Sequence, residues 1–210
     1  MRKNIIQSGN KNSVGETVIQ NDWFNGTIPA NVQLGQNVFI DSSFGFSVFN
    51  SKHPDAMKMG FAAASYNLTV FATSKNGQIE IGDYSIVNGC NIICSQKIHI
   101  GKYVMIAWGT VIYDNYLSAD LHKEERMNVL IKNANLDNRE MPFSRASPVF
   151  IEDNVWIGFD AVIKPGTTIG RGSVIGSKAV ISGKIKPYSV VVGNPGRIIK
   201  TLNPTDKDIL

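Results

Sequence analysis

Isoleucine recurs at every sixth position in the last third of the chain. A small or β-branched residue follows four positions after each of the first five isoleucines in this series. A period of six fits neither a lone helix nor a lone amphipathic strand. It fits a short strand plus a tight turn, so three units form a triangular coil of about 18 residues with an apolar interior. The isoleucines are Ile151, Ile157, Ile163, Ile169, Ile175 and Ile181, and the residues that follow are Val155, Ala161, Thr167, Ser173 and Ala179.

Two earlier blocks repeat the pattern. They comprise Ile28, Leu34 and Ile40, and then Ile81, Val87, Ile93, Ile100, Ile106 and Ile112. Residues 41–78 lack the period and are predicted to be irregular. Residues 113–150 also lack it and form a long polar loop excursion, which is where a rigid solenoid often carries its function.

These blocks predict an all-β parallel β-helix in three parts. Residues 1–60 form an irregular N-terminal part with early coils. Residues 61–186 form the β-helix domain, interrupted by the excursion at 113–150. Residues 187–210 form a short C-terminal tail on the cofactor side. At 210 residues and 43% apolar, the chain is long enough to bury one core.

Composition narrows the function. The net charge is +4, and basic residues gather late in the chain, where they suit a phosphorylated cofactor. No nucleic-acid module is recognisable, and no apolar run approaches the roughly 20 residues of a membrane span. Without an apolar signal core at its start, the chain is expected to be cytoplasmic. Cys90 and Cys94 are expected to be buried free thiols.

The closing motifs resemble those of a known family. Val155-Trp156-Ile157-Gly158, Pro165-Gly166-Thr167-Thr168-Ile169-Gly170 and Gly193-Asn194-Pro195-Gly196-Arg197 are similar to motifs of the hexapeptide-repeat acyltransferase superfamily. The resemblance implies a left-handed coil and a homotrimer. It also implies an enzyme that transfers acetyl from acetyl-CoA to a hydroxyl of a sugar-like acceptor.

The same resemblance implies a binding site for acetyl-CoA. Backbone amides near Gly158 and Ser177 would hold the pantetheine arm, beside Trp156. Ser182 and Gly183 occupy the place where the family often has Thr-Lys. Arg197 and Lys200 would meet the phosphates, because cationic side chains suit phosphate by charge and donor geometry. No metal ligand set is expected.

The catalytic position departs from the family pattern. The family usually has a base histidine in a D-H-x-x-H setting, whereas Asn115 and Ser118 stand at the two histidine positions here. Transfer to a hydroxyl needs a group that takes the proton. His122 and Asp114 are the candidates within the excursion. His53 is interpreted as a surface-turn residue, and His99 as a structural residue at a coil corner.

Three alternatives stay open at this point. A zinc enzyme of the carbonic anhydrase type would need histidines from adjacent coils, and the chain has no H-x4-H pair. A catalytically silent trimer would fit the loss of the base but not the Gly193–Arg197 motif. Transfer to an amine would need less help from a protein base. The acceptor itself has no recognisable motif.

Overall fold

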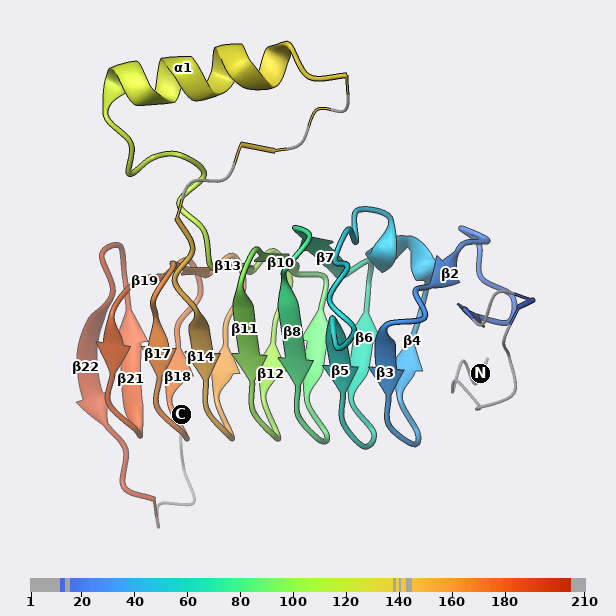
Figure 1. Cartoon of the computed structure of the whole chain (residues 1–210). Coiled ribbons are helices and arrows are strands. Elements are labelled where there is room, and N and C mark those ends of the chain that lie inside the picture. The colour runs from blue at the N-terminus through green and yellow to red at the C-terminus, as the bar shows by residue number, and fades with distance from the viewer. Residues whose placement is uncertain (1–11, 14–15, 138, 140, 143–144, 205–210) are drawn as a thin grey trace.

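The computed structural model describes residues 12–13, 16–137, 139, 141–142 and 145–204. Successive short strands wind into a three-walled prism, with each wall a sheet of parallel strands from successive coils (Figure 1). The prism is a left-handed parallel β-helix, as the sequence predicts. No described helix is long and apolar enough to cross a membrane.

Sheet I contains β3 (Val32–Leu34), β5 (Met57–Met59), β8 (Gln78–Ile81), β11 (Lys97–Ile100), β14 (Val149–Ile151), β17 (Thr168–Ile169) and β20 (Lys184–Ile185). Sheet II contains β4 (Phe39–Ile40), β6 (Ala64–Tyr66), β9 (Ile86–Asn88), β12 (Met105–Ile106), β15 (Trp156–Ile157), β18 (Val174–Ile175), β21 (Ser189–Val192) and β22 (Arg197–Thr201). Sheet III contains β7 (Val70–Thr73), β10 (Asn91–Cys94), β13 (Val111–Tyr113), β16 (Val162–Ile163) and β19 (Val180–Ile181).

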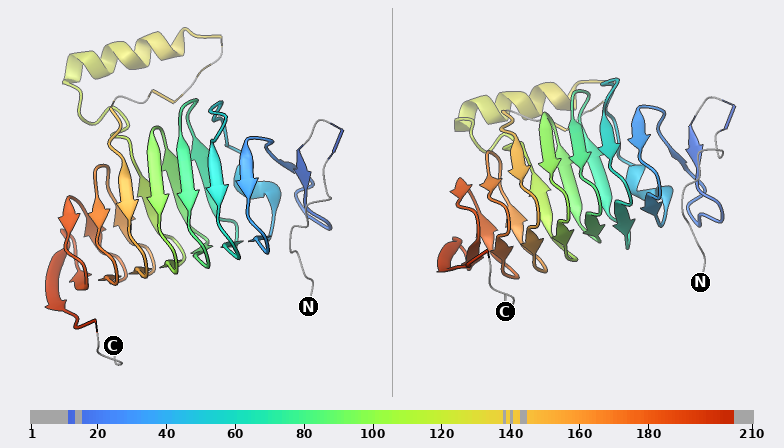
Figure 2. Two further views of the ribbon diagram at one scale, coloured as in Figure 1. Left: turned by 60° about the horizontal axis from the view of Figure 1, so that its bottom comes forward. Right: turned by 90° about the horizontal axis from the view of Figure 1, so that it is seen from below.

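Four further elements flank or interrupt this stack. The strands β1 (Thr17–Val18) and β2 (Thr27–Ile28) form an antiparallel pair before the first coil. The 3-10 helix η1 (Ser43–Phe46) follows β4, and the helix α1 (Lys123–Ala134) lies in the excursion. Both views of Figure 2 place α1 outside the prism, next to the middle and later coils.

The core is a set of aliphatic ladders along the axis of the prism. Ile151 pairs with Ile169 on sheet I, and Ile157 pairs with Ile175 on sheet II. All four side chains are completely buried. Each fully buried aliphatic side chain contributes roughly 1.5–3 kcal/mol. Stacking of coils therefore supplies the stability that no single coil has.

The first irregular stretch is the main difference from the sequence prediction. Residues 41–78 contain η1 and the complete coil of β5, β6 and β7, so the prediction that this stretch is irregular is wrong. Its inward positions are filled by Met57, Met59, Ser65 and Phe71, all buried. Because isoleucine is absent from these positions, the six-residue period is hidden there.

Two smaller corrections concern the register and the ends of the coils. Ile92, not Ile93, points into the core, because Ile92 pairs with Phe71 and Ile112 and is completely buried. The coils continue past the predicted boundary at 186, since β21 pairs in parallel with β18. The chain then turns back, and β22 pairs antiparallel with β21.

Candidate active site

The excursion begins at a buried carboxylate. Asp114 follows β13 and is completely buried. Its carboxylate accepts hydrogen bonds from the backbone N–H groups of Ser95 (2.7 Å), Gln96 (2.7 Å) and Lys97 (2.8 Å), which form the turn between β10 and β11. Burial raises the pKa of Asp114, and these hydrogen bonds oppose the rise. Asp114 thus ties the start of the excursion to the preceding coil.

Asn115 and Ser118 are engaged within the excursion. The side-chain amide of Asn115 donates to Ser95 Oγ (3.0 Å), and its oxygen accepts from the Leu117 backbone N–H (3.2 Å). Ser118 Oγ donates to the Pro142 carbonyl (2.5 Å). Both residues are buried. The two positions expected to hold histidines therefore stabilise the loop, and neither offers a basic nitrogen.

The segment that returns from the excursion runs beside the segment that leaves β13. Asn115 forms an antiparallel bridge with Ala146. Arg145 lies over the ring of Tyr116, 4.8 Å from its centroid, and its Nε lies 3.8 Å from a carboxylate oxygen of Asp120. The root of the excursion is therefore a narrow stem held by side-chain contacts.

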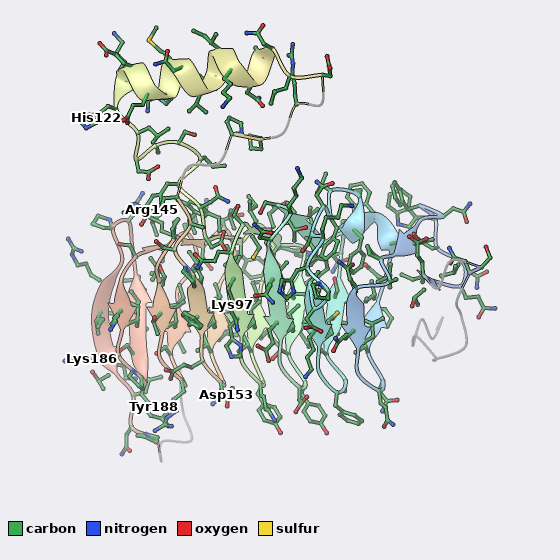
Figure 3. The ribbon with its side chains drawn as sticks, in the orientation of Figure 1. Lys97, His122, Arg145, Asp153, Lys186 and Tyr188 are labelled. Atoms are coloured by element: carbon green, nitrogen blue, oxygen red, sulfur yellow. The ribbon has the colours of Figure 1, made fainter. Side chains whose placement is uncertain are left out.

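His122 lies at the N-terminal end of α1. Its side chain is exposed, and its backbone N–H donates to the Glu125 carboxylate (3.2 Å). Figure 3 shows His122 at the end of the helix, away from the coils. No residue of α1 is buried. The structure thus places Asp114 inside the stem and His122 on a projecting helix, and it does not bring the two predicted catalytic residues together.

The predicted donor-binding residues lie on the last coils. Trp156 is half-buried on the outer face of β15. Gly158 and Ser177 are neighbours on successive coils, since a Cβ added at Gly158 would lie 2.7 Å from the Ser177 backbone nitrogen. Thr110 Oγ1 donates to the Gly158 carbonyl (3.0 Å), which fixes this turn. The structure therefore groups these residues along the edge between sheets II and III.

The other predicted donor residues form two further groups. Ser182 and Gly183 are exposed in the turn between β19 and β20, on the edge between sheets III and I. Arg197 and Lys200 are exposed on β22, the final strand of sheet II. The Arg197 guanidinium donates a hydrogen bond to the Gly196 carbonyl (3.3 Å). The three groups occupy the same end of the prism but not one surface.

Sheet I carries an open pocket that the sequence analysis did not identify. Its volume is about 160 Å³, and it is lined by Asp55, Lys58, Gln78, Ile79, Glu80 and Lys97. His99 Nδ1 lies 3.0 Å from Glu80 Oε2, at the border of this pocket. His53 lies on the other side, with a ring nitrogen 3.2 Å from Gln78 Nε2.

His99 does not lie at a coil corner as predicted. It is in the middle of β11, where Ile98 and Ile100 point inward and are buried, so the imidazole points outward. The alternation of polar and apolar residues from Lys97 to Ile100 already indicates a strand that places His99 on its outer face. Among the described residues, no three His, Cys, Asp or Glu side chains gather as a metal site would require.

Comparison with known proteins agrees with this geometry. The family model described as bacterial transferase hexapeptide (six repeats) matches residues 148–183. A hexapeptide-repeat acetyltransferase of Vibrio cholerae, solved in complex with acetyl-CoA, superimposes with a TM-score of 0.55 at 26% identity. This superposition covers 76% of this chain and 74% of that one. The chain is similar to the hexapeptide-repeat acyltransferases in its late coils and in its fold.

Further acyltransferases are similar to this chain over different lengths. A probable acetyltransferase of Mycobacterium tuberculosis is 30% identical over 162 residues, which cover 72% of this chain and 54% of that protein. A chloramphenicol acetyltransferase of Escherichia coli is 47% identical over 58 residues, or 28% of each chain. This chain thus spans about half or less of the curated relatives it matches. An N-acyltransferase of Bacillus cereus, AntD, shares the fold at 18% identity and a TM-score of 0.61, covering 82% of this chain and 85% of that one.

Proposed function

We propose that this protein is an acyltransferase that moves acetyl from acetyl-CoA to a hydroxyl of a sugar-like acceptor. The observation that carries the proposal is the set of late coils matched by the hexapeptide model, which hold the candidate donor-binding residues other than Arg197 and Lys200. Relatives named acetyltransferases and the acetyl-CoA complex of the Vibrio cholerae protein support it.

The donor would bind along the late coils through backbone and cationic groups. Gly158 lacks a side chain, so a pantetheine arm can approach the Ser177 amide without meeting a Cβ. Arg197 and Lys200 are exposed on one short strand, where they can bind phosphate oxygens by charge-assisted hydrogen bonds. Trp156, Ser182 and Gly183 would contribute contacts beside this arm.

A homotrimer is part of the proposal. Met105 and Trp108 are each 47% exposed, and Phe159 is 48% exposed, along sheet II and its edge with sheet III. Trp108 and Phe159 contact each other at a centroid distance of 6.4 Å. An exposed apolar row of this kind is typical of a protein–protein interface. The cytoplasmic location inferred from the sequence stays a prediction.

Turnover tests the activity directly. Acetyl-CoA is incubated with the protein and a panel of sugars, and release of coenzyme A thiol and the mass of the acceptor are followed. An acceptor-dependent gain of one acetyl group supports the proposal. Acetyl-CoA binding without transfer to any acceptor would instead support the silent trimer, which the engaged Asn115 and Ser118 side chains favour.

The same assay decides between oxygen and nitrogen as the acceptor atom. An amino sugar and its hydroxyl analogue are compared side by side at matched concentrations. We expect faster transfer to the hydroxyl compound if the protein supplies its own base. Exclusive acetylation of the amine would overturn the hydroxyl part of the proposal and leave the acyltransferase part intact.

A further inference from the structure

The outer face of sheet I places an imidazole against a carboxylate. His99 on β11 and Glu80 on β8 are directly opposite each other in the strand register. Their side chains are 34% and 43% exposed, and His99 Nδ1 lies 3.0 Å from Glu80 Oε2. On the other flank, His99 pairs in register with Phe150 of β14, and the two ring centroids are 6.4 Å apart. The imidazole therefore lies between a carboxylate and an aromatic ring.

This arrangement selects one state of the imidazole. A carboxylate beside Nδ1 favours a proton on that nitrogen, which leaves the lone pair of Nε2 directed away from Glu80. The structure gives His99 Nε2 no hydrogen-bond partner among the residues it describes. An imidazole oriented by a carboxylate and open at Nε2 has the form of a general base.

The pocket beside this pair suits a polyhydroxyl compound. Its lining combines the ammonium groups of Lys58 and Lys97 with the Gln78 amide and two carboxylates, those of Asp55 and Glu80. Such mixed donors and acceptors can bind hydroxyl groups, and Ile79 adds an apolar contact to the lining. The charged groups that face the imidazole are Glu80, Lys58 and Lys97, while β14 presents the apolar Phe150.

The position of the pocket connects it to the excursion. Lys97 both lines the pocket and donates its backbone N–H to Asp114 at the root of the excursion. Ser182 and Gly183 lie on the same edge of the prism, between sheets III and I. Figure 3 shows Lys97 on the coil stack and His122 on the helix beyond the stem. The pocket therefore borders the root of the excursion, while β14 and β17 separate it from Ser182 and Gly183.

We propose that the pocket on sheet I holds the acceptor and that His99, oriented by Glu80, is the general base. The proposal rests on the acyltransferase function proposed above. His99 Nε2 takes the proton of an acceptor hydroxyl as the hydroxyl oxygen forms a bond to the thioester carbonyl carbon of acetyl-CoA. The carbon–sulfur bond then breaks, and the proton passes from the imidazole to the coenzyme A thiolate. The products are an acetyl ester and free coenzyme A.

Substitution with an isostere that is not basic tests this assignment. His99→Gln is expected to lower kcat by about 100-fold or more, the usual contribution of a general base. It should leave acetyl-CoA affinity unchanged, which also shows that the fold is intact. His99→Ala should recover activity when free imidazole is added, whereas a merely structural residue would not respond.

The alternative hypothesis is that the general base is His122, in the excursion. His122→Gln receives the same assays, and a 100-fold loss there with full activity in His99→Gln would overturn the assignment to His99. Loss of acceptor affinity alone in His99→Gln, with kcat retained, would also overturn it. Absence of turnover by the wild type with every acceptor would overturn the proposed function, and the base assignment with it.

Discussion

The three backbone hydrogen bonds to Asp114 give a stability test that separates structural from chemical roles. In Asp114→Asn, an amide NH2 replaces one carboxylate oxygen. One oxygen accepts from Ser95, and the other accepts from Gln96 and Lys97. The better amide orientation therefore leaves only the Ser95 N–H without an acceptor. An unsatisfied buried donor costs about 1–3 kcal/mol, and removal of the buried charge offsets part of this.

We expect Asp114→Asn to lower the free energy of unfolding by about 1–2 kcal/mol. Asp114→Ala removes all three acceptor contacts and should cost roughly 3 kcal/mol or more. Urea unfolding followed by circular dichroism measures both values, provided that the m-value is unchanged. Asp137→Asn, at an exposed position of the excursion, is the matched control and should change stability by less than about 0.5 kcal/mol.

The pH dependence of this effect has a definite sign. Burial raises the pKa of Asp114 above 3.8, so the folded state binds the proton more tightly than the unfolded state. The contribution of Asp114 to stability is therefore greatest at low pH and is lost as pH rises through the folded-state pKa. As pH rises from the ordinary pKa of Asp114 through its folded-state pKa, the difference in free energy of unfolding between wild type and Asp114→Asn should become smaller. An Asp114→Asn protein that is as stable as the wild type but inactive would refute the structural role and restore Asp114 as a candidate base.

Two further predictions concern the core. Ile106→Ala should lower the free energy of unfolding by about 2–5 kcal/mol in urea titrations, because Ile106 is completely buried between coils; a loss below about 1 kcal/mol would contradict the ladder. Cys90 and Cys94 are buried free thiols, and burial raises the pKa of Cys90 to about 12 and that of Cys94 further. An aromatic disulfide reagent should therefore leave both unmodified in the native protein and react with both in denaturant; rapid reaction in the native state would contradict their burial.

The sequence predicts the coils only where the ladder is made of isoleucine. From Ile151 to Ile181 every sixth residue is isoleucine, and the structure buries all six. Met59, Ser65 and Phe71 fill equivalent positions in an earlier coil. Packing between neighbouring coils determines which side chains can occupy an inward position. Side chains of different size can therefore occupy equivalent positions in different coils. Periodicity in one residue type does not detect such a coil.

The candidate site can be predicted only in part from the sequence, for a related reason. Asn115 and Ser118 are visible in the sequence as departures from the family pattern, and the structure shows how each is engaged. The His99–Glu80 pair joins residues 19 positions apart, which become neighbours only through the stacking of β11 on β8. No local motif marks such a pair, because its members meet across coils.

Acetyl-CoA binding tests the central claim most directly. Isothermal titration is carried out with wild type, Arg197→Ala and Arg171→Ala, the last removing an exposed arginine that lies outside the candidate donor site. We expect saturable binding by the wild type, an unchanged affinity in Arg171→Ala and an affinity weaker by about 10- to 100-fold in Arg197→Ala, which is the loss of one charge-assisted contact. No binding at millimolar acetyl-CoA, or equal affinity in all three proteins, would contradict a donor site on the late coils.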